Sequence, residues 1–79
     1  MKVKVRFFAS CREIAGQPQV ELELTKGETV SSVLNKIRHD FPRLSLADIL
    51  VAVNQEFAAP GDVLHEGDEV ALIPPVSGG

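Results

Sequence analysis

The sequence predicts an α+β fold in which a mixed sheet curls around one main helix. Residues in the first third of the chain alternate twice between apolar and polar, as they do in half-buried strands. One amphipathic helix follows, and a short apolar run lies near the end of the sequence. A crossover through a helix allows that last strand to lie parallel to the first. With 79 residues, 44% of them hydrophobic, the chain is expected to form one small domain.

The first two strands are expected at residues 2–7 and 19–24, where apolar and polar side chains alternate strictly. They should pair as an antiparallel hairpin. Phe8 lies at an even-numbered position, as do Lys2, Lys4 and Arg6, so its ring should point away from the core. The inward side chains of this hairpin are expected to be Val3, Val5, Phe7, Val20, Leu22 and Leu24.

A short helical turn is expected in the connection between these strands, at residues 9–15. Ser10 is expected to be its N-cap, with Glu13 three residues later as in a capping box, and Gly16 is expected to end it. Cys11 is expected to be a packed small side chain rather than a reactive thiol. A single cysteine forms no internal disulfide, and the sequence has neither an export signal nor an apolar stretch of about 20 residues. We therefore expect a cytoplasmic location.

The main helix is expected to begin after Thr29, which is a favourable N-cap residue. It should end near Asp40, because the residue before Pro42 is disfavoured in the helical conformation. One apolar stripe at helical spacing should cover the sheet, and it consists of Val30, Val33, Leu34 and Ile37.

Short elements are expected between the helix and the last strand. The apolar residues 44–50 should form a single helical turn that runs into a strand at residues 51–53. A turn at residues 54–56 and a very short strand at residues 57–58 come next.

The last strand is expected at residues 69–73, with Val70 and Leu72 in the core. Ala71 and Ile73 should then face outward beside Phe8. The predicted order of hairpin, helix, short strands and parallel last strand is the β-grasp or ubiquitin-like arrangement. One face of its sheet would be open to solvent or to a partner, and three apolar groups on that face favour a partner.

The charge balance argues against nucleic acid or an anionic membrane as a partner. The net charge is −3, and no cluster of lysine and arginine stands out. The sequence contains no phosphate-binding loop, no dinucleotide-binding glycine pattern and no metal-ligand spacing. His39 and His65 are isolated and are expected to be solvated, as are the carboxylates of Asp62, Glu66, Asp68 and Glu69. We therefore expect this chain to bind no cofactor or metal and to have no internal active site.

The last six residues are expected to form an extended arm, residues 74–79, that leads away from a domain of residues 1–73. Pro74 and Pro75 stop the last strand and favour a stiff extended path. Ser77, Gly78 and Gly79 make the arm thin, and six residues span about 20 Å at most. The terminal carboxylate could enter a narrow slot, where a partner with ATP could activate it as an acyl-adenylate for capture by an amine or by sulfur. A frayed terminus is the alternative.

Several segments resemble the small, sulfur-carrier subunits of molybdopterin synthases. The ending Pro74-Pro75-Val76-Ser77-Gly78-Gly79, preceded by Gly67-Asp68-Glu69-Val70, is similar to the end of that family. Phe7-Phe8-Ala9 followed by Arg12-Glu13 resembles its start, and Val51-Ala52-Val53-Asn54-Gln55 resembles its middle. The resemblance covers essentially the whole chain, and it departs at Ile73, where the family often has Phe.

The resemblance implies a carrier cycle centred on Gly79. An E1-like adenylating enzyme would activate Gly79 with its own ATP and Mg²⁺, and a persulfide donor would convert it to a thiocarboxylate, with Gly78 giving clearance in the channel. In a heterotetramer with the large subunit, sulfur would pass to cyclic pyranopterin monophosphate to form molybdopterin. The chain would then act in an enzyme only as the sulfur-donating subunit, without a catalytic pocket of its own. The partner-binding residues implied are Phe8, Arg12, Ala71, Ile73, Pro74, Pro75, Val76 and Ser77.

Three other functions fit the sequence. A sulfur carrier for thiamin thiazole synthesis shares the fold, the Gly-Gly ending and the chemistry up to the thiocarboxylate. A ubiquitin-like modifier would instead join Gly79 to lysines of target proteins. A β-grasp interaction domain would need no reactive end.

Overall fold

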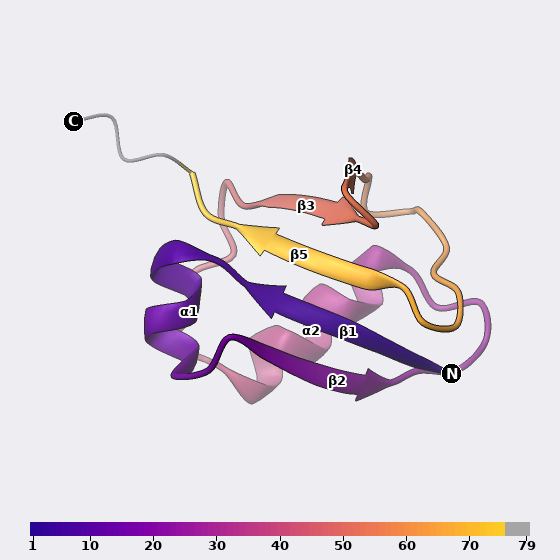
Figure 1. Ribbon diagram of the computed structural model, residues 1–79, viewed down its shortest axis with the longest axis horizontal. Helices are drawn as coiled ribbons and strands as arrows, with labels where there is room; N and C mark the ends of the chain where they lie inside the picture. The colour runs from indigo at the N-terminus through magenta and orange to yellow at the C-terminus, as the bar shows by residue number, and fades with distance from the viewer. Residues whose placement is uncertain (76–79) are drawn as a thin grey trace.

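The computed structural model describes residues 1–75, which form a sheet and two helices (Figure 1). The predictions for Val76, Ser77, Gly78 and Gly79 lie outside the described residues. The elements are β1 (Lys2–Phe7), α1 (Ala9–Ala15), β2 (Gln19–Glu23), α2 (Val30–Asp40), β3 (Leu50–Val53), β4 (Glu56–Phe57) and β5 (Glu69–Ile73).

The sheet has the strand order β2-β1-β5-β3-β4. β1 pairs antiparallel with β2 and parallel with β5, which confirms the predicted hairpin and the predicted return of the last strand. β3 pairs antiparallel with both β5 and β4. In Figure 1, α2 lies behind the sheet and no helix lies in front of it. The predicted α+β class and ubiquitin-like arrangement are confirmed, and the sheet has one open face.

The core lies between α2 and the covered face of the sheet. The helix contributes Val30, Val33 and Ile37, each at most 1% exposed. The sheet contributes Val3, Val5, Phe7, Val70 and Leu72, as predicted.

The core differs from its prediction in two respects. Val20, Leu22 and Leu34 are only partly buried: β2 is an edge strand, and Leu34 lies on the flank of α2 beside an apolar groove. The core also includes Cys11, Leu44, Val51 and Leu64. Cys11 is the packed small side chain that the sequence predicted, whereas the burial of Leu44 and Leu64 in loops left no periodic signal.

Helix α1 has the predicted bounds, but its N-cap differs from the prediction. Phe8, not Ser10, is the N-cap of α1, and Ser10 lies inside the helix, so the predicted capping box is wrong. The N–H of Phe8 donates to the carbonyl of Leu72 at 3.3 Å, which extends the pairing of β1 with β5 by one residue. Ala9 then turns the chain into the helix with φ 46°. Gly16 ends α1 in the left-handed conformation, as predicted.

Helix α2 has the predicted bounds, but the segment that follows it does not form the predicted helical turn. Thr29 is the N-cap, and the helix ends at Asp40. Residues 44–49 contain no helix, and their apolar side chains pack into or against the core from this irregular segment. Those side chains are Leu44, Leu46 and Ile49.

Candidate docking site on the open face of the sheet

Strand register places one row of side chains straight across the open face. Arg6 of β1 is opposite Ala71 of β5, and Ala71 is opposite Ala52 of β3. Ala52 is in turn opposite Phe57 of β4. Directly paired residues share a face of the sheet, so this row runs from a cation on β1 to an aromatic ring at the β4 edge.

The end of the face where β5 finishes is apolar. Ile73 lies opposite Leu50, which is 50% exposed, and the Phe57 ring is 77% exposed. Phe8, Phe57, Ala71 and Ile73 line an open-face hollow of about 310 Å³, with Ala52 and Gln55 completing its apolar and neutral wall. The structure therefore brings Phe8, Ala71 and Ile73 together as the parity argument predicted. Their role as partner-binding residues stays a prediction.

The other half of the open face is charged and alternates in sign. Lys4 lies between Glu21 of β2 and Glu69 of β5, and Lys2 lies opposite Glu23. Opposite charges on neighbouring strands attract each other, so the charged side chains of this half are paired within the sheet without a partner protein. Because only the other half of the open face is apolar, we expect an apolar partner surface to bind at the end where β5 finishes.

Arg6 and Glu69 form the boundary between the two halves. Arg6 Nη1 donates to Glu69 Oε1 at 3.1 Å, and the two side chains are 42% and 37% exposed. The guanidinium carbon of Arg6 lies 5.1 Å from the centroid of the Phe8 ring. A pair this exposed adds only about 0–1 kcal/mol to stability. Its main consequence is geometric, because it holds a cation against the aromatic wall of the hollow.

The β3–β4 hairpin is fixed to the start of β5 by Asn54. Asn54 and Gln55 have φ values of 50° and 72°, as the two central residues of a tight hairpin turn require. The Asn54 side chain donates to Asp68 Oδ1 at 2.9 Å and accepts from the Glu69 N–H at 3.0 Å. This clamp orients the hairpin that carries Phe57.

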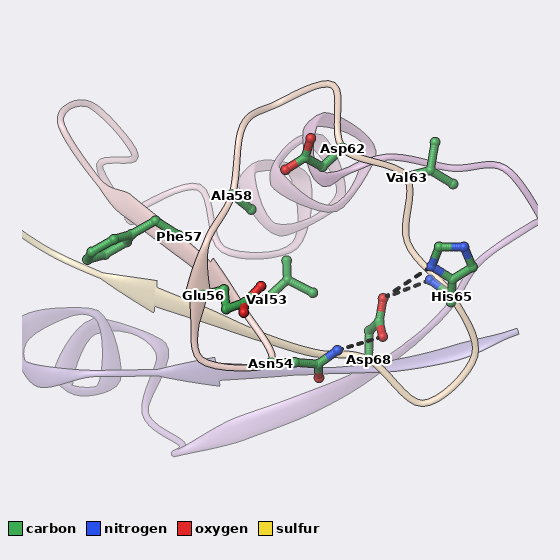
Figure 2. A pocket seen from close by; sticks show the side chains of 9 residues that line it. All are labelled: Val53, Asn54, Glu56, Phe57, Ala58, Asp62, Val63, His65 and Asp68. Atoms are coloured by element: carbon green, nitrogen blue, oxygen red, sulfur yellow. Dashed lines mark hydrogen bonds and ion pairs between the residues drawn. The ribbon is translucent and has the colours of Figure 1, made fainter.

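A second hollow, of about 640 Å³, lies between this hairpin and the loop that precedes β5 (Figure 2). Asp68 bridges its floor, accepting from Asn54 and from the His65 N–H at 2.8 Å. The Asp68 side chain is only 13% exposed, so its predicted solvation is wrong. Asp62 accepts from the Ala59 N–H at 2.9 Å. The carboxylates shape the loop, and Figure 2 shows Phe57 pointing away from them.

The remaining candidate side chains are Cys11 and His39. Cys11 is buried, and burial raises the pKa of its thiol, which keeps it protonated and unreactive. His39 lies at the end of α2 with its side chain 88% exposed, beside Asp40. Within residues 1–75, no three His, Cys, Asp or Glu side chains gather as they would around a metal ion. The helices in that range are too short and polar to cross a bilayer.

The other predicted partner-binding residues lie around the hollow rather than in it. Arg12 is exposed on α1 and does not line the hollow. Pro74 is partly buried and Pro75 is exposed, and both continue the chain from Ile73 at the apolar end. The predictions for the last four residues lie outside the described part of the chain.

A mixed five-stranded sheet with one long helix on one face, and the other face open, defines a ubiquitin-like protein of the β-grasp class. The ThiS family model matches residues 5–79, and the chain belongs to the ThiS family. The predicted resemblance to sulfur-carrier proteins is thereby confirmed.

Individual relatives agree over the full length. The chain is 41% identical to the molybdopterin synthase sulfur carrier subunit of Chlamydomonas reinhardtii, and the match covers all of both chains. It is similar to the crystal structure of SAMP1 from Haloferax volcanii, with a TM-score of 0.88 and 32% identity over all of both chains. It is also similar to the putative molybdopterin converting factor subunit 1 of Pyrococcus furiosus. That TM-score is 0.86, with 31% identity over 96% of this chain and 99% of the other.

Proposed function

We propose that this chain is the sulfur carrier of molybdopterin synthesis, with Gly79 as the reacting residue. The observation that carries the proposal is the full-length similarity to curated sulfur carrier subunits of molybdopterin synthase. The open-face hollow supports it, because an apolar docking surface lies where β5 leads into Pro74 and the Gly-Gly ending.

The chemistry of the cycle follows from the weakness of a carboxylate as an electrophile. On an E1-like partner, the Gly79 carboxylate attacks ATP and pyrophosphate leaves, which gives an acyl-adenylate. A persulfide sulfur then attacks the carbonyl carbon, AMP leaves, and a thiol reduces the resulting acyl disulfide to the thiocarboxylate. In the large subunit this sulfur passes to cyclic pyranopterin monophosphate, and water restores the carboxylate.

The chain's own contribution is docking and delivery. The apolar end of the open face binds each partner, and Phe8, Ala71 and Ile73 are joined there by Leu50 and Phe57. Arg12, Pro74, Pro75, Val76 and Ser77 contact the partner along the path to its active site. Gly78 lets the backbone pass a constriction that a side chain would block.

Reconstitution tests the proposal. Purified large subunit, adenylating enzyme, ATP, Mg²⁺ and a sulfur source should yield molybdopterin with the parent protein. Intact mass should show one oxygen of Gly79 replaced by sulfur. Deleting Gly79, or adding one residue after it, should abolish both results without changing the thermal melt. If the protein that lacks Gly79 still supports molybdopterin formation, the carrier function is wrong.

The similarity to SAMP1 favours a second candidate function. SAMP1 of Haloferax volcanii is named small archaeal modifier protein 1, and it matches this fold over its full length. As a modifier, this chain would join Gly79 to a lysine amine of a target with loss of AMP from the same adenylate. An isopeptide-linked ladder in cell extracts, absent when Gly79 is deleted, would support the modifier function, whereas molybdopterin formation in the reconstituted system would support the carrier.

A further inference from the structure

Arg6 has most of its hydrogen-bonding capacity unused at the edge of the open-face hollow. A guanidinium carries five N–H donors in a fixed fork. Of the residues that the structure describes, only Glu69 accepts from this one, through a single bond of 3.1 Å. The Phe8 ring covers part of the guanidinium plane but accepts no conventional hydrogen bond. Water therefore satisfies the other donors while the face is open.

Glu69 has spare capacity as well. Its Oε1 atom accepts from Arg6, and its second carboxylate oxygen accepts from no other residue in the described part of the chain. A partner that covers the hollow removes water from both groups. Docking is then penalised unless the partner supplies an acceptor for Arg6 and a donor for Glu69.

We propose that the Arg6–Glu69 pair is the specificity-determining element of the docking surface and that it recognises an uncharged amide group of the large subunit. A single amide offers a carbonyl oxygen to Arg6 and an N–H to Glu69. The two charges cancel, and every other residue that lines the hollow is uncharged, so a neutral group fits this site. A carboxylate would be repelled by Glu69, and an ammonium by Arg6.

The same geometry places an apolar side chain next to that amide. Phe8, Ala71 and Phe57 form the wall beside the ion pair, so the partner segment should carry an apolar residue adjacent to the recognised amide. This inference rests on the proposed function, because that function supplies the large subunit as the occupant.

Calorimetric titration of the purified large subunit with the parent protein and four variants tests the inference. Arg6→Met keeps the aliphatic stem and removes the donors, and it should weaken binding about tenfold. Glu69→Gln keeps an acceptor oxygen of the same shape and should weaken binding by no more than about threefold. Lys4→Met is the matched control, because Lys4 faces the same side of β1 without lining the hollow, and it should change the Kd less than about twofold.

Arg6→Lys keeps the charge but not the fork, so its Kd should fall between those of the parent and Arg6→Met. If Arg6→Met binds as tightly as Lys4→Met, the ion pair is not recognised and the inference is wrong. Tighter binding by Glu69→Gln at low salt would also overturn it, because that result indicates a partner carboxylate. A parent protein that does not bind the large subunit refutes the proposed function instead, so the two failures are distinguishable.

Discussion

Replacing Phe57 should affect docking much more than it affects the stability of the fold. The sequence alone did not identify this residue. Its ring is 77% exposed at the β4 edge, so it contributes about a quarter of a buried side chain to the fold. Full burial of Phe is worth about 1.5–3 kcal/mol. Phe57→Ala should therefore lower the free energy of unfolding by only about 0.5 kcal/mol.

The effect of the same change on docking is larger. Covering the exposed three quarters of the ring at a partner interface is worth about 1–2 kcal/mol, so Phe57→Ala should weaken binding to the large subunit roughly 5- to 30-fold. Val63→Ala is the control, because Val63 is 51% exposed but lines the second hollow, away from the open face. It should leave the calorimetric Kd unchanged.

Two results would refute this reasoning. Equal affinities for Phe57→Ala and Val63→Ala would remove the β4 edge from the interface. A loss of more than about 1 kcal/mol in a urea titration would mean that Phe57 supports the fold, and that its effect on binding is indirect.

Two further predictions concern the core. Ile37→Ala removes three carbons from a site with 0% exposure and should lower the free energy of unfolding by about 2–5 kcal/mol. Leu34 lies one turn earlier and is only partly buried, so Leu34→Ala should lower the free energy of unfolding by less than half as much. Equal losses in urea titrations would contradict the observed burial. Burial raises the pKa of the Cys11 thiol, so the stability from the neutral thiol is fully present below the ordinary thiol pKa and is lost as pH rises toward the folded-state value. The stability difference between the parent and Cys11→Ala should therefore shrink at alkaline pH, and a difference that is constant with pH would argue against an uncharged buried thiol.

The periodic elements could be predicted from the sequence, and the irregular ones could not. Alternation defined β1 and β2, and helical spacing defined α2, because each buries one face against a common core. Leu44 and Leu64 reach the same core from loops, where burial depends on tertiary position rather than on period. The predicted N-cap of α1 was wrong because a sheet hydrogen bond from Phe8 to Leu72 determines where β1 ends, and a rule based on local sequence does not include that bond.

The candidate site likewise contains some residues that could be predicted from the sequence and others that could not. Phe8, Ala71 and Ile73 follow from strand parity once β1 and β5 are neighbours. Leu50 and Phe57 depend on the register of β3 against β5 and on the turn held by Asn54. The length of the turn between β3 and β4 decides which of their side chains face outward, and the sequence pattern did not define that length.

The position of the hollow constrains how the carrier works. Residues 74–79 span about 20 Å at most, so any active site that uses Gly79 must lie within that distance of the end of β5. Under the proposed function, the adenylating enzyme and the large subunit would both use Gly79 and the same apolar end of the open face. We therefore expect the carrier to release one partner before it docks on the other. A small surface with one exposed ring and a half-exposed ion pair suits this exchange, because it allows specific contact and rapid dissociation together.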